Sequence, residues 1–142
     1  MGISKASASW DGDLKSGRGT MKPDNAGEIP FSLGTRFEGV KGSNPEEVIG
    51  AALAGCFSMA LSLGLEKAGM KPERIRTEAK VHLDKAGEGF AIKKIELTNE
   101  TRATGGDEAK FKQVAEETKK ACPVSKALAG VSEITLDAKL AR

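Results

Sequence analysis

The longest feature in the pattern of apolar and polar positions is an uncharged run near the middle of the chain. From Val48 to Leu65 the sequence reads VIGAALAGCFSMALSLGL, eighteen residues without a charged side chain. Asn44 suits the N-cap position before this run, and Pro45 suits the first helical position. Glu46 and Glu47 then interact favourably with the positive end of a helix dipole. The pattern predicts a helix that begins after Asn44.

The uncharged run admits two interpretations. Its length is formally that of a transmembrane helix, but glycines and serines dilute its hydrophobicity and no basic flank sets an orientation. We favour a helix that is apolar all round because it lies at the centre of a fold. A single small domain has difficulty covering such a helix on every side, so we expect a homodimer in which two small-residue faces meet. That face consists of Ala51, Ala52, Ala54, Gly55 and Ala60.

The segments before this helix carry weaker patterns. Residues 3–10 predict a strand, and residues 11–19 predict a turn because they are rich in Gly, Asp and Ser. Residues 21–34 are punctuated by Gly and Pro and are expected to form a loop. Residues 35–40 resemble a short strand.

The segments after the helix carry clearer patterns. Arg74–Leu83 alternates between apolar and polar residues, which predicts a half-buried strand with His82 on its polar face. We interpret His82 as a solvated or strand-pairing residue. Phe90–Thr101 alternates except at Lys93 and Lys94, which indicates a β-bulge.

The C-terminal third predicts two helices and a closing strand. Asp107–Ala121 is amphipathic, with Phe111 and the positions three, four, seven and eleven residues later on one face. Pro123 ends this helix, a short helix over Pro123–Ala129 follows, and Ser132–Leu140 alternates as a final strand. Helices gathered around antiparallel strands give an α+β fold, which we expect to be a single domain over residues 1–142.

Composition excludes several classes of protein. Twenty-two basic and 20 acidic residues give a formal charge of +2, which argues against binding to nucleic acid or a membrane surface. Two cysteines are too few for a disulfide scaffold, and one histidine excludes a multi-histidine metal site. The first ten residues lack a secretion pattern, so the expected location is the cytoplasm, where cysteines are more often redox-active than structural.

The candidate chemistry therefore rests on the two thiols. Cys56 lies inside the apolar helix, where a cysteine is usually an inert small hydrophobe. Cys122 lies where one helix ends and Pro123 begins the next, so it can cap the second helix, and the free N–H groups there lower a thiol pKa. It can also be a core residue on the stripe that begins at Phe111. Lys119, Lys120 and Lys126 add positive potential around Cys122.

Two cysteine motifs carry a resemblance to a known family. The run TRFEGVKGSNPEEVIGAALAGCFSM from Thr35 to Met59, the later ACPVSKAL and EITLDAKL, and the opening SWDGDLKSGRGT resemble the OsmC/Ohr family of thiol peroxidases, more closely its OsmC branch. The resemblance implies an intertwined homodimer in which antiparallel sheets enclose central helices. It also implies reduction of organic hydroperoxides, and less efficiently of hydrogen peroxide, in stress defence.

The resemblance also implies roles for particular residues. Cys56 matches the peroxidatic cysteine, Cys122 matches the resolving cysteine, and Arg36 and Glu46 match the pair that completes the site. Electrons are expected from a dithiol such as a lipoylated protein, and no metal, flavin or haem is expected. The chemistry fits these residue types, because a guanidinium held by a carboxylate can stabilise a buried thiolate and hold the peroxide. An apolar pocket that includes Phe57 and Met59 would favour alkyl hydroperoxides.

Four alternatives remain open at this point. Local electrostatics alone would make Cys122 the more acidic thiol, and a nearby Arg36 would reverse that order. Arg18, in an early Gly-rich turn, is a second candidate for the catalytic arginine. Glu46 lies ten residues from Cys56, about 15 Å along a straight helix, so Glu46 can serve the site from the partner subunit. A non-catalytic dimeric module that binds a small apolar ligand is the alternative function.

Overall fold

The computed structural model describes residues 2–141, which form two compact units. Residues up to Val48 make the first unit and residues from Ile49 make the second. Each unit combines a three-stranded sheet with helical structure. The α+β class predicted from the sequence is confirmed.

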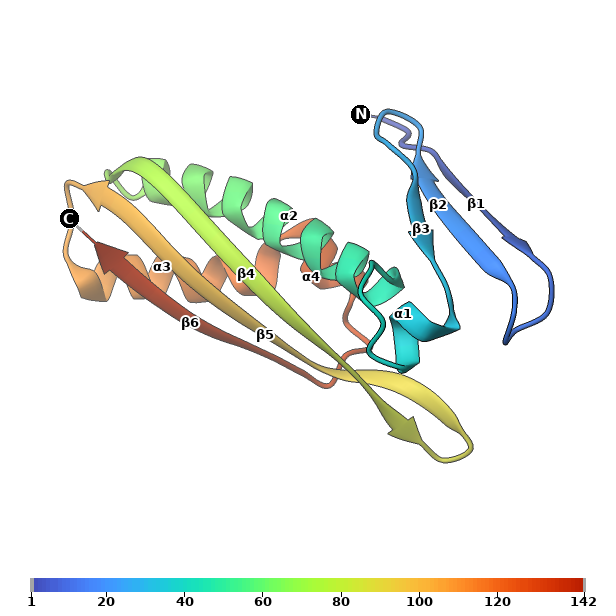
Figure 1. The fold of residues 1–142 in the computed structure, drawn as a ribbon. Helices are drawn as coiled ribbons and strands as arrows, with labels where there is room; N and C mark the ends of the chain where they lie inside the picture. Colours follow the sequence, from blue (N-terminus) through green and yellow to red (C-terminus); the bar gives the residue numbers. More distant parts are fainter. Residues whose placement is uncertain (1, 142) are drawn as a thin grey trace. The chain divides into compact units, whose positions relative to one another are not determined.

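The first unit is an antiparallel sheet followed by a short helix (Figure 1). Strands β1 (Ala6–Asp11), β2 (Arg18–Pro23) and β3 (Ile29–Phe31) lie in that order, and α1 (Leu33–Phe37) follows. The prediction of a loop over residues 21–34 was therefore wrong. Proline is tolerated in β3 because this strand pairs only with β2 and is an edge strand.

The expectation of a strand over residues 35–40 was also wrong, because α1 covers the beginning of this segment. Ser32 is the N-cap of α1, and its hydroxyl accepts a 3.2 Å hydrogen bond from the Thr35 N–H. The Ser32 N–H donates to the Thr35 hydroxyl at 2.9 Å. This reciprocal capping box satisfies donors at the start of the helix and overrides the strand preference of the sequence.

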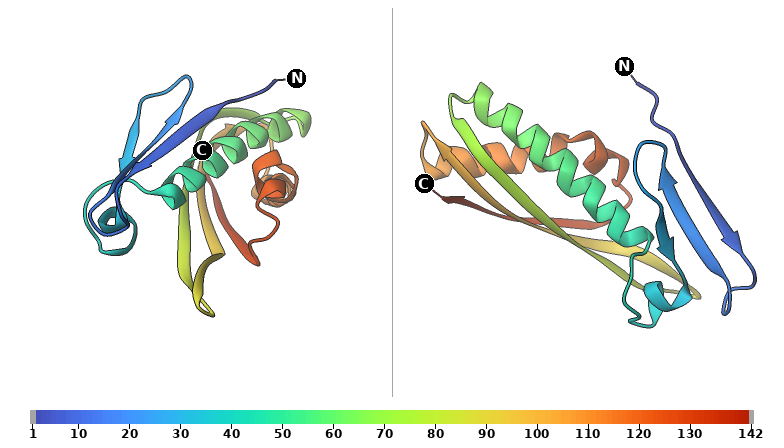
Figure 2. Two further views of the ribbon diagram at one scale, coloured as in Figure 1. Left: turned by 90° about the vertical axis from the view of Figure 1, so that its right-hand side faces the viewer. Right: turned by 45° about the horizontal axis from the view of Figure 1, so that its top comes forward.

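Helix α2 (Pro45–Lys67) begins where the sequence predicts it. The Asn44 side-chain oxygen accepts a 2.8 Å hydrogen bond from the Glu47 N–H, so Asn44 caps the helix as expected. Figures 1 and 2 show α2 and α3 (Glu108–Ala121) on the same face of the sheet in the second unit. The large buried side chains of α2 form one stripe at intervals of four residues: Leu53, Phe57, Leu61 and Leu65.

The sheet of the second unit has the order β4 (Lys71–Ala86), β5 (Gly89–Thr104) and β6 (Glu133–Ala141). Strands β4 and β5 are antiparallel, but β6 is parallel to β5. The antiparallel pairing that the resemblance implies therefore holds for β4 with β5 but not for β5 with β6. The reason is the long crossover through α3 and α4 (Pro123–Ala127), which returns the chain in the direction of β5.

The predicted β-bulge is confirmed. His82 pairs with Lys94, whereas Leu83 pairs with Ile92, so Lys93 is the extra residue on β5. Beyond this point the two strands continue as a hairpin that projects past the helices (Figure 1). The bulge therefore separates the packed part of the sheet from its projecting end.

The sheet face away from the helices carries the only histidine of the sequence. His82 Nε2 lies 2.7 Å from Glu96 Oε2, across the β4–β5 pair. This hydrogen bond, more than the charge of nearby Lys94, holds the pKa of the Glu96 carboxyl below its ordinary value. His82 thus takes the strand-pairing role predicted for it.

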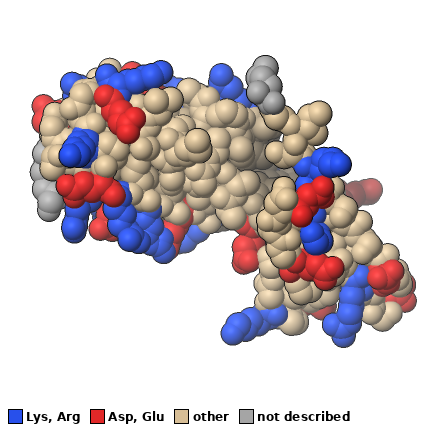
Figure 3. Space-filling view, turned by 90° about the horizontal axis from the view of Figure 1, so that it is seen from above, with Lys and Arg blue, Asp and Glu red and all other residues tan. Residues whose placement is uncertain are grey.

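The other face of α2 is apolar and exposed. Helix α2 is long and apolar enough to cross a membrane by length and composition alone, and 28% of its most apolar stretch is buried. Figure 3 shows a broad surface without charged side chains over this helix. Met59 is 80% exposed and Leu63 is 53% exposed. Within the predicted small-residue face, Ala51, Ala52 and Gly55 are exposed, and Ala54 and Ala60 are half-buried.

Candidate active site

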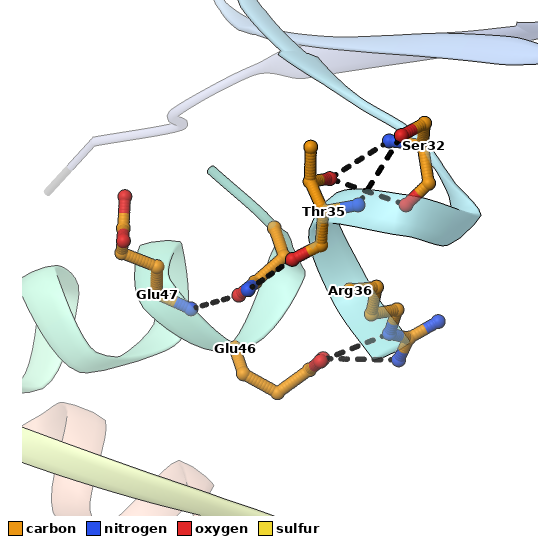
Figure 4. A network of polar contacts seen from close by, with 6 residues as sticks. Ser32, Thr35, Arg36, Glu46 and Glu47 are labelled. Carbon is orange, nitrogen blue, oxygen red and sulfur yellow. Dashed lines mark hydrogen bonds and ion pairs between the residues drawn. The ribbon is translucent and has the colours of Figure 1, made fainter. Parts of the chain in front are cut away.

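The junction between α1 and α2 brings two of the predicted site residues together. Arg36 Nε donates to Glu46 Oε1 and Arg36 Nη2 donates to Glu46 Oε2, each at 2.9 Å (Figure 4). The Glu46 side chain is 8% exposed and the Arg36 side chain 36%. The two parallel bonds fix the plane of the guanidinium, which lies 5.3 Å from the ring centroid of Phe37.

Asn44 ties these two helices to each other. Its side-chain amide donates to the Thr35 carbonyl at 3.2 Å, while its side-chain oxygen caps α2. Arg36 follows Thr35, and Glu46 lies in the first turn of α2. The two hydrogen bonds of Asn44 therefore position Arg36 relative to Glu46. The pair is thus built within one chain, from residues of the first unit alone.

The two candidate arginines have different surroundings. Arg18 begins β2 and is exposed, whereas Arg36 holds the buried Glu46 carboxylate. The two glycines beside Arg18 have a packing role instead. A Cβ atom on Gly17 would collide with the Asp13 carbonyl oxygen, and one on Gly19 would lie 2.5 Å from the Phe31 ring. Glycine therefore makes room for the backbone of the turn at the first position and for an aromatic ring at the second.

The second unit brings the two thiols together. Cys122 is 1% exposed and caps α4, as the sequence suggests, with its Sγ accepting a 3.4 Å hydrogen bond from the Ser125 N–H. Cys56 lies in the middle of α2, is half-buried, and is close enough to the Cys122 thiol for the two groups to influence each other electrostatically. Both cysteines are free thiols. Residues 66 positions apart in the sequence are thus neighbours in the fold.

The surroundings of Cys56 act on its acidity in opposite directions. Burial is the largest effect and raises the pKa of the Cys56 thiol above its ordinary value. The backbone N–H of Val124 donates a hydrogen bond that lowers this pKa, and the neighbouring Cys122 raises it. The net direction is upward. The Val124 N–H was missed by sequence reasoning, because a backbone donor on a distant helix leaves no signal in the side-chain pattern.

Two cavities lie beside these residues, one in each unit. A groove of about 450 Å³ between α2 and α3 has Cys122 among its lining residues, together with Leu63 and Val114. A smaller cavity of about 270 Å³ lies in the first unit. Of the two residues expected in an apolar pocket, Phe57 was assigned wrongly, because it is fully buried in the core, whereas Met59 is exposed on α2. The smaller cavity is lined by Trp10, Leu14, Phe31, Ser32, Leu33, Arg36 and Phe37.

No metal-binding cluster is found among residues 2–141, where no three His, Cys, Asp or Glu side chains are grouped so as to hold an ion. The side chains that the fold does group are the Arg36–Glu46 pair and the Cys56–Cys122 pair. An α+β chain with two neighbouring free thiols belongs to the class of dithiol proteins.

Comparisons with known proteins identify the family. A family model described as OsmC-like protein matches residues 38–137. The chain is 49% identical over 138 residues to Peroxiredoxin OsmC of Escherichia coli (strain K12), covering 96% of this chain and 95% of that protein. It is 28% identical over 103 residues to the organic hydroperoxide resistance protein OhrA of Bacillus subtilis (strain 168), covering 68% and 67%. The chain belongs to the OsmC family.

Solved structures share this fold. An OsmC-like protein from Mycoplasma pneumoniae superposes with a TM-score of 0.78 at 18% identity, covering 99% of each chain. The organic hydroperoxide resistance protein OhrB of Bacillus subtilis superposes with a TM-score of 0.70 at 24% identity, covering 95% of this chain and 98% of that one. At these identities the comparison establishes the fold, and the resemblance found in the sequence is confirmed by the family match.

Proposed function

We propose that this chain is a thiol-dependent peroxidase that reduces organic hydroperoxides, with Cys56 as the attacking thiol and Cys122 as the resolving thiol. Peroxidase activity follows from the 49% identity with a peroxiredoxin over nearly the whole chain. The observation that carries the assignment of residues is the proximity of two free thiols, one within α2 and one at the start of α4. Its substrates are a peroxide and a thiol reductant.

The reaction balances with these two sulfurs. The Cys56 thiolate attacks one oxygen of the hydroperoxide, the O–O bond breaks, and the alkoxide leaves as an alcohol after taking a proton. Cys56 is then a sulfenic acid. The Cys122 thiolate attacks its sulfur, forming the S–S bond and releasing hydroxide, which takes a proton to become water. A dithiol reductant, for which we propose a lipoylated protein, reduces the disulfide and is itself oxidised.

The Arg36–Glu46 pair supplies what the thiol pair lacks. Burial raises the pKa of Cys56, so the thiolate needs a cation to form near neutral pH. In the proposal the Arg36 guanidinium stabilises that thiolate and holds the peroxide, and Glu46 fixes the guanidinium through two bonds of 2.9 Å. One nitrogen, Nη1, takes no part in those two bonds and can donate to a peroxide oxygen.

The proposal includes a homodimer. The exposed apolar face of α2, with Met59 and Leu63 at its centre, is the surface that a second copy would cover. A dimer leaves open whether Arg36 and Glu46 serve Cys56 of their own chain or of the partner. In this assembly the two units act as one OsmC-like domain over residues 1–142, with no membrane contact, and we place the protein in the cytoplasm.

Peroxide consumption by purified protein tests the assignment. Reduced protein is mixed with cumene hydroperoxide, and peroxide loss and free thiols are measured. We expect one peroxide consumed and both thiols lost per chain. Cys56→Ser should consume none, whereas Cys122→Ser should complete one turnover and retain a sulfenic acid that dimedone traps. Dihydrolipoamide and thioredoxin are then compared as reductants of the oxidised protein.

Three outcomes would contradict the proposal. Peroxide loss by Cys56→Ser together with a sulfenic acid on Cys122 would exchange the two roles. Peroxide loss without disulfide formation would remove Cys122 from the mechanism. No loss above the buffer rate in the unaltered protein would favour the non-catalytic binding module. Unfolding of each variant, followed by circular dichroism, controls for damage to the fold.

A further inference from the structure

The exposed face of the sheet in the second unit carries a cluster of arginines at the end where β6 finishes. Arg74 and Arg76 lie on β4, and Arg102 lies on β5 beside the last residues of β6. These three side chains, which we call the arginine cluster, line a surface cavity of about 210 Å³ together with Glu100 and Ala141. Helix α2, which the proposed dimer covers, packs on the opposite face of this sheet (Figures 1 and 2), so the dimer leaves the cavity open.

A β-bulge places two of these arginines directly opposite each other. Pro72 pairs with Ala103 across the two strands. The next pair is Arg74 with Arg102, so Glu73 is an extra residue on β4. An unbroken register would set Glu73 opposite Arg102 instead. The bulge therefore replaces an attractive cross-strand pair by a repulsive one, which destabilises the sheet unless something else compensates.

The two opposed guanidinium groups have no acidic partner in the described part of the chain. Neither Arg74 nor Arg102 has a side-chain hydrogen bond or an ion pair with another residue among residues 2–141. Glu78 already bonds to Arg76, with Oε1 2.8 Å from Nη2. An anion that accepts hydrogen bonds from both opposed groups would replace their repulsion by attraction to a shared charge.

Charge indicates the class of this anion. Glu78 neutralises Arg76, and Glu100 lies beside Lys139 on β6, which balances it. The two opposed arginines are therefore left with an excess of two positive charges. A phosphate group carries a charge of about −1.5 to −2 at pH 7, which matches this excess.

Size and surroundings restrict the ligand to a compact anion. At about 30 Å³ per water-sized group, the cavity holds about seven non-hydrogen atoms, enough for a phosphate group with a small substituent. Further along the same face, Glu78, Thr98 and Asp137 lie side by side across the three strands. Their two carboxylates repel a polyanion that extends along the sheet. A nucleic acid strand therefore does not fit this face.

We infer that the arginine cluster binds a phosphate dianion, either free phosphate or the phosphate group of a small monoester, with Arg74 and Arg102 donating to its oxygens. Arginine suits this ligand because its planar guanidinium can donate two parallel hydrogen bonds to a phosphate. The site is separate from the proposed peroxide chemistry, since none of the cysteines and neither partner of the Arg36–Glu46 pair lines the cavity.

Binding can be measured by NMR on isotope-labelled protein titrated with inorganic phosphate. Ionic strength is held constant with sodium chloride, because salt alone screens the repulsion between the arginines. We expect saturable shifts of the Arg74 and Arg102 Nε–H signals, with a dissociation constant on the order of millimolar for a ligand of this size. Glycerol phosphate is titrated in parallel. Binding as tight as that of inorganic phosphate assigns the site to phosphate monoesters, and weaker binding assigns it to free phosphate.

Variants test which side chains hold the anion. In Arg102→Gln the dissociation constant for phosphate should rise by about fivefold or more, because charged hydrogen bonds are lost. Arg102→Lys keeps the charge but not the planar fork, so its dissociation constant should lie between those of the parent and Arg102→Gln. Lys80→Gln is the matched control. It also removes one positive charge from the exposed face, but Lys80 does not line the cavity, so its dissociation constant should stay within about twofold of the parent value.

Urea unfolding provides the second measurement. Without phosphate, Arg102→Gln should have a higher urea midpoint than the parent, because the repulsive pair is gone. Phosphate should raise the midpoint of the parent by binding the folded state and leave that of Arg102→Gln nearly unchanged. A lower midpoint of Arg102→Gln without phosphate would refute the repulsion on which the inference rests.

Two further outcomes would overturn the inference. Shifts that are linear in phosphate concentration, or that chloride reproduces at the same ionic strength, would mean that the arginines are only screened. A loss of affinity in Lys80→Gln as large as that in Arg102→Gln would mean that phosphate responds to the overall charge of the face. Peroxide consumption by Arg102→Gln should equal that of the parent, so neither outcome bears on the proposed function.

Discussion

Among the features of the proposed site, the Arg36–Glu46 ion pair can be tested most directly. The strength of the ion pair can be measured without knowing the substrate. The perturbation is a double-mutant cycle with Arg36→Ala, Glu46→Ala and the double variant. Each variant removes one or both partners of the two 2.9 Å bonds. The cycle isolates the coupling between the two side chains from their other contacts.

The expected magnitude follows from the exposure of the two groups. Hydrogen bonds to charged groups contribute about 1.5–3 kcal/mol, whereas fully exposed ion pairs contribute about 0.2–1 kcal/mol. Glu46 is 8% exposed and Arg36 is 36% exposed, so the pair lies between these limits and we expect a coupling of about 1–2 kcal/mol. Arg36→Ala should destabilise the fold more than Glu46→Ala, since it leaves a buried carboxylate unpaired, whereas the arginine can be rehydrated.

Urea unfolding is the assay, with fluorescence of Trp10 as the probe because this residue lies in the same unit as the pair. The slopes of the four transitions must agree before their midpoints are converted to free energies. A coupling below about 0.5 kcal/mol is within the range of simple additivity and would refute the argument that the bidentate pair fixes the guanidinium. Greater destabilisation by Glu46→Ala than by Arg36→Ala would refute the burial argument.

Three further predictions concern the core, the thiol and the exposed sheet face. Phe57→Ala should destabilise the fold by about 3–5 kcal/mol, measured by urea unfolding, because Phe57 is fully buried; a smaller loss would mean that it lines an open pocket. Arg36→Ala should move the pH profile of Cys56 alkylation by iodoacetamide upward by about one pH unit or more, and an unchanged profile would place Arg36 away from the thiol. The pKa of Glu96 is lowered by His82, so this contact stabilises the folded chain above the ordinary carboxyl pKa and is lost as the pH falls through the folded pKa. On acidification below pH 4.5, the urea midpoint of the His82→Ala variant should therefore fall by less than that of the parent protein. An equal fall in the two midpoints would contradict this.

The helices that the sequence predicted well are those whose signals are local. Helix α2 has an Asn-Pro start and a long uncharged run, and α3 has Asp107 as its N-cap and a buried face led by Phe111. Capping and helical periodicity lie within a few residues of each other in the chain. Long strands with clear alternation, such as β4, were predicted for the same reason.

The segment from residue 21 to residue 40 was misassigned because its structure depends on partners distant in the sequence. Strand β3 exists through its pairing with β2, and the Trp10–Gly19–Phe31 row spans three strands. Helix α1 had a usable local signal in Ser32 and Thr35, but threonine replaces the Glu or Gln typical of a capping box. The parallel β5–β6 pairing also leaves no mark on the alternation of either strand.

The candidate site was accessible to sequence reasoning only in part. The junction before Pro123 indicated that Cys122 caps a helix, which is confirmed by its bond with the Ser125 N–H. The roles proposed for Arg36 and Glu46 came from the family resemblance, since neither the charge pattern nor the helix pattern distinguishes Arg36 from Arg18. The proximity of Cys56 and Cys122 depends on how α2 packs beside α3 and α4, which periodicity does not specify.

The opposing effects on Cys56 explain why a dithiol alone is an incomplete peroxidase. Burial places the thiol beside Cys122, which favours disulfide formation, and the same burial raises the pKa of Cys56 and suppresses the thiolate that must attack first. The Val124 N–H lowers this pKa but does not reverse the shift. A cation is therefore required, and in the proposal it comes from Arg36, whose ion pair is built by the other unit. Activity then depends on how the units assemble, so a variant that disturbs assembly should lose the first step, attack on peroxide, while disulfide exchange with a small oxidised dithiol persists.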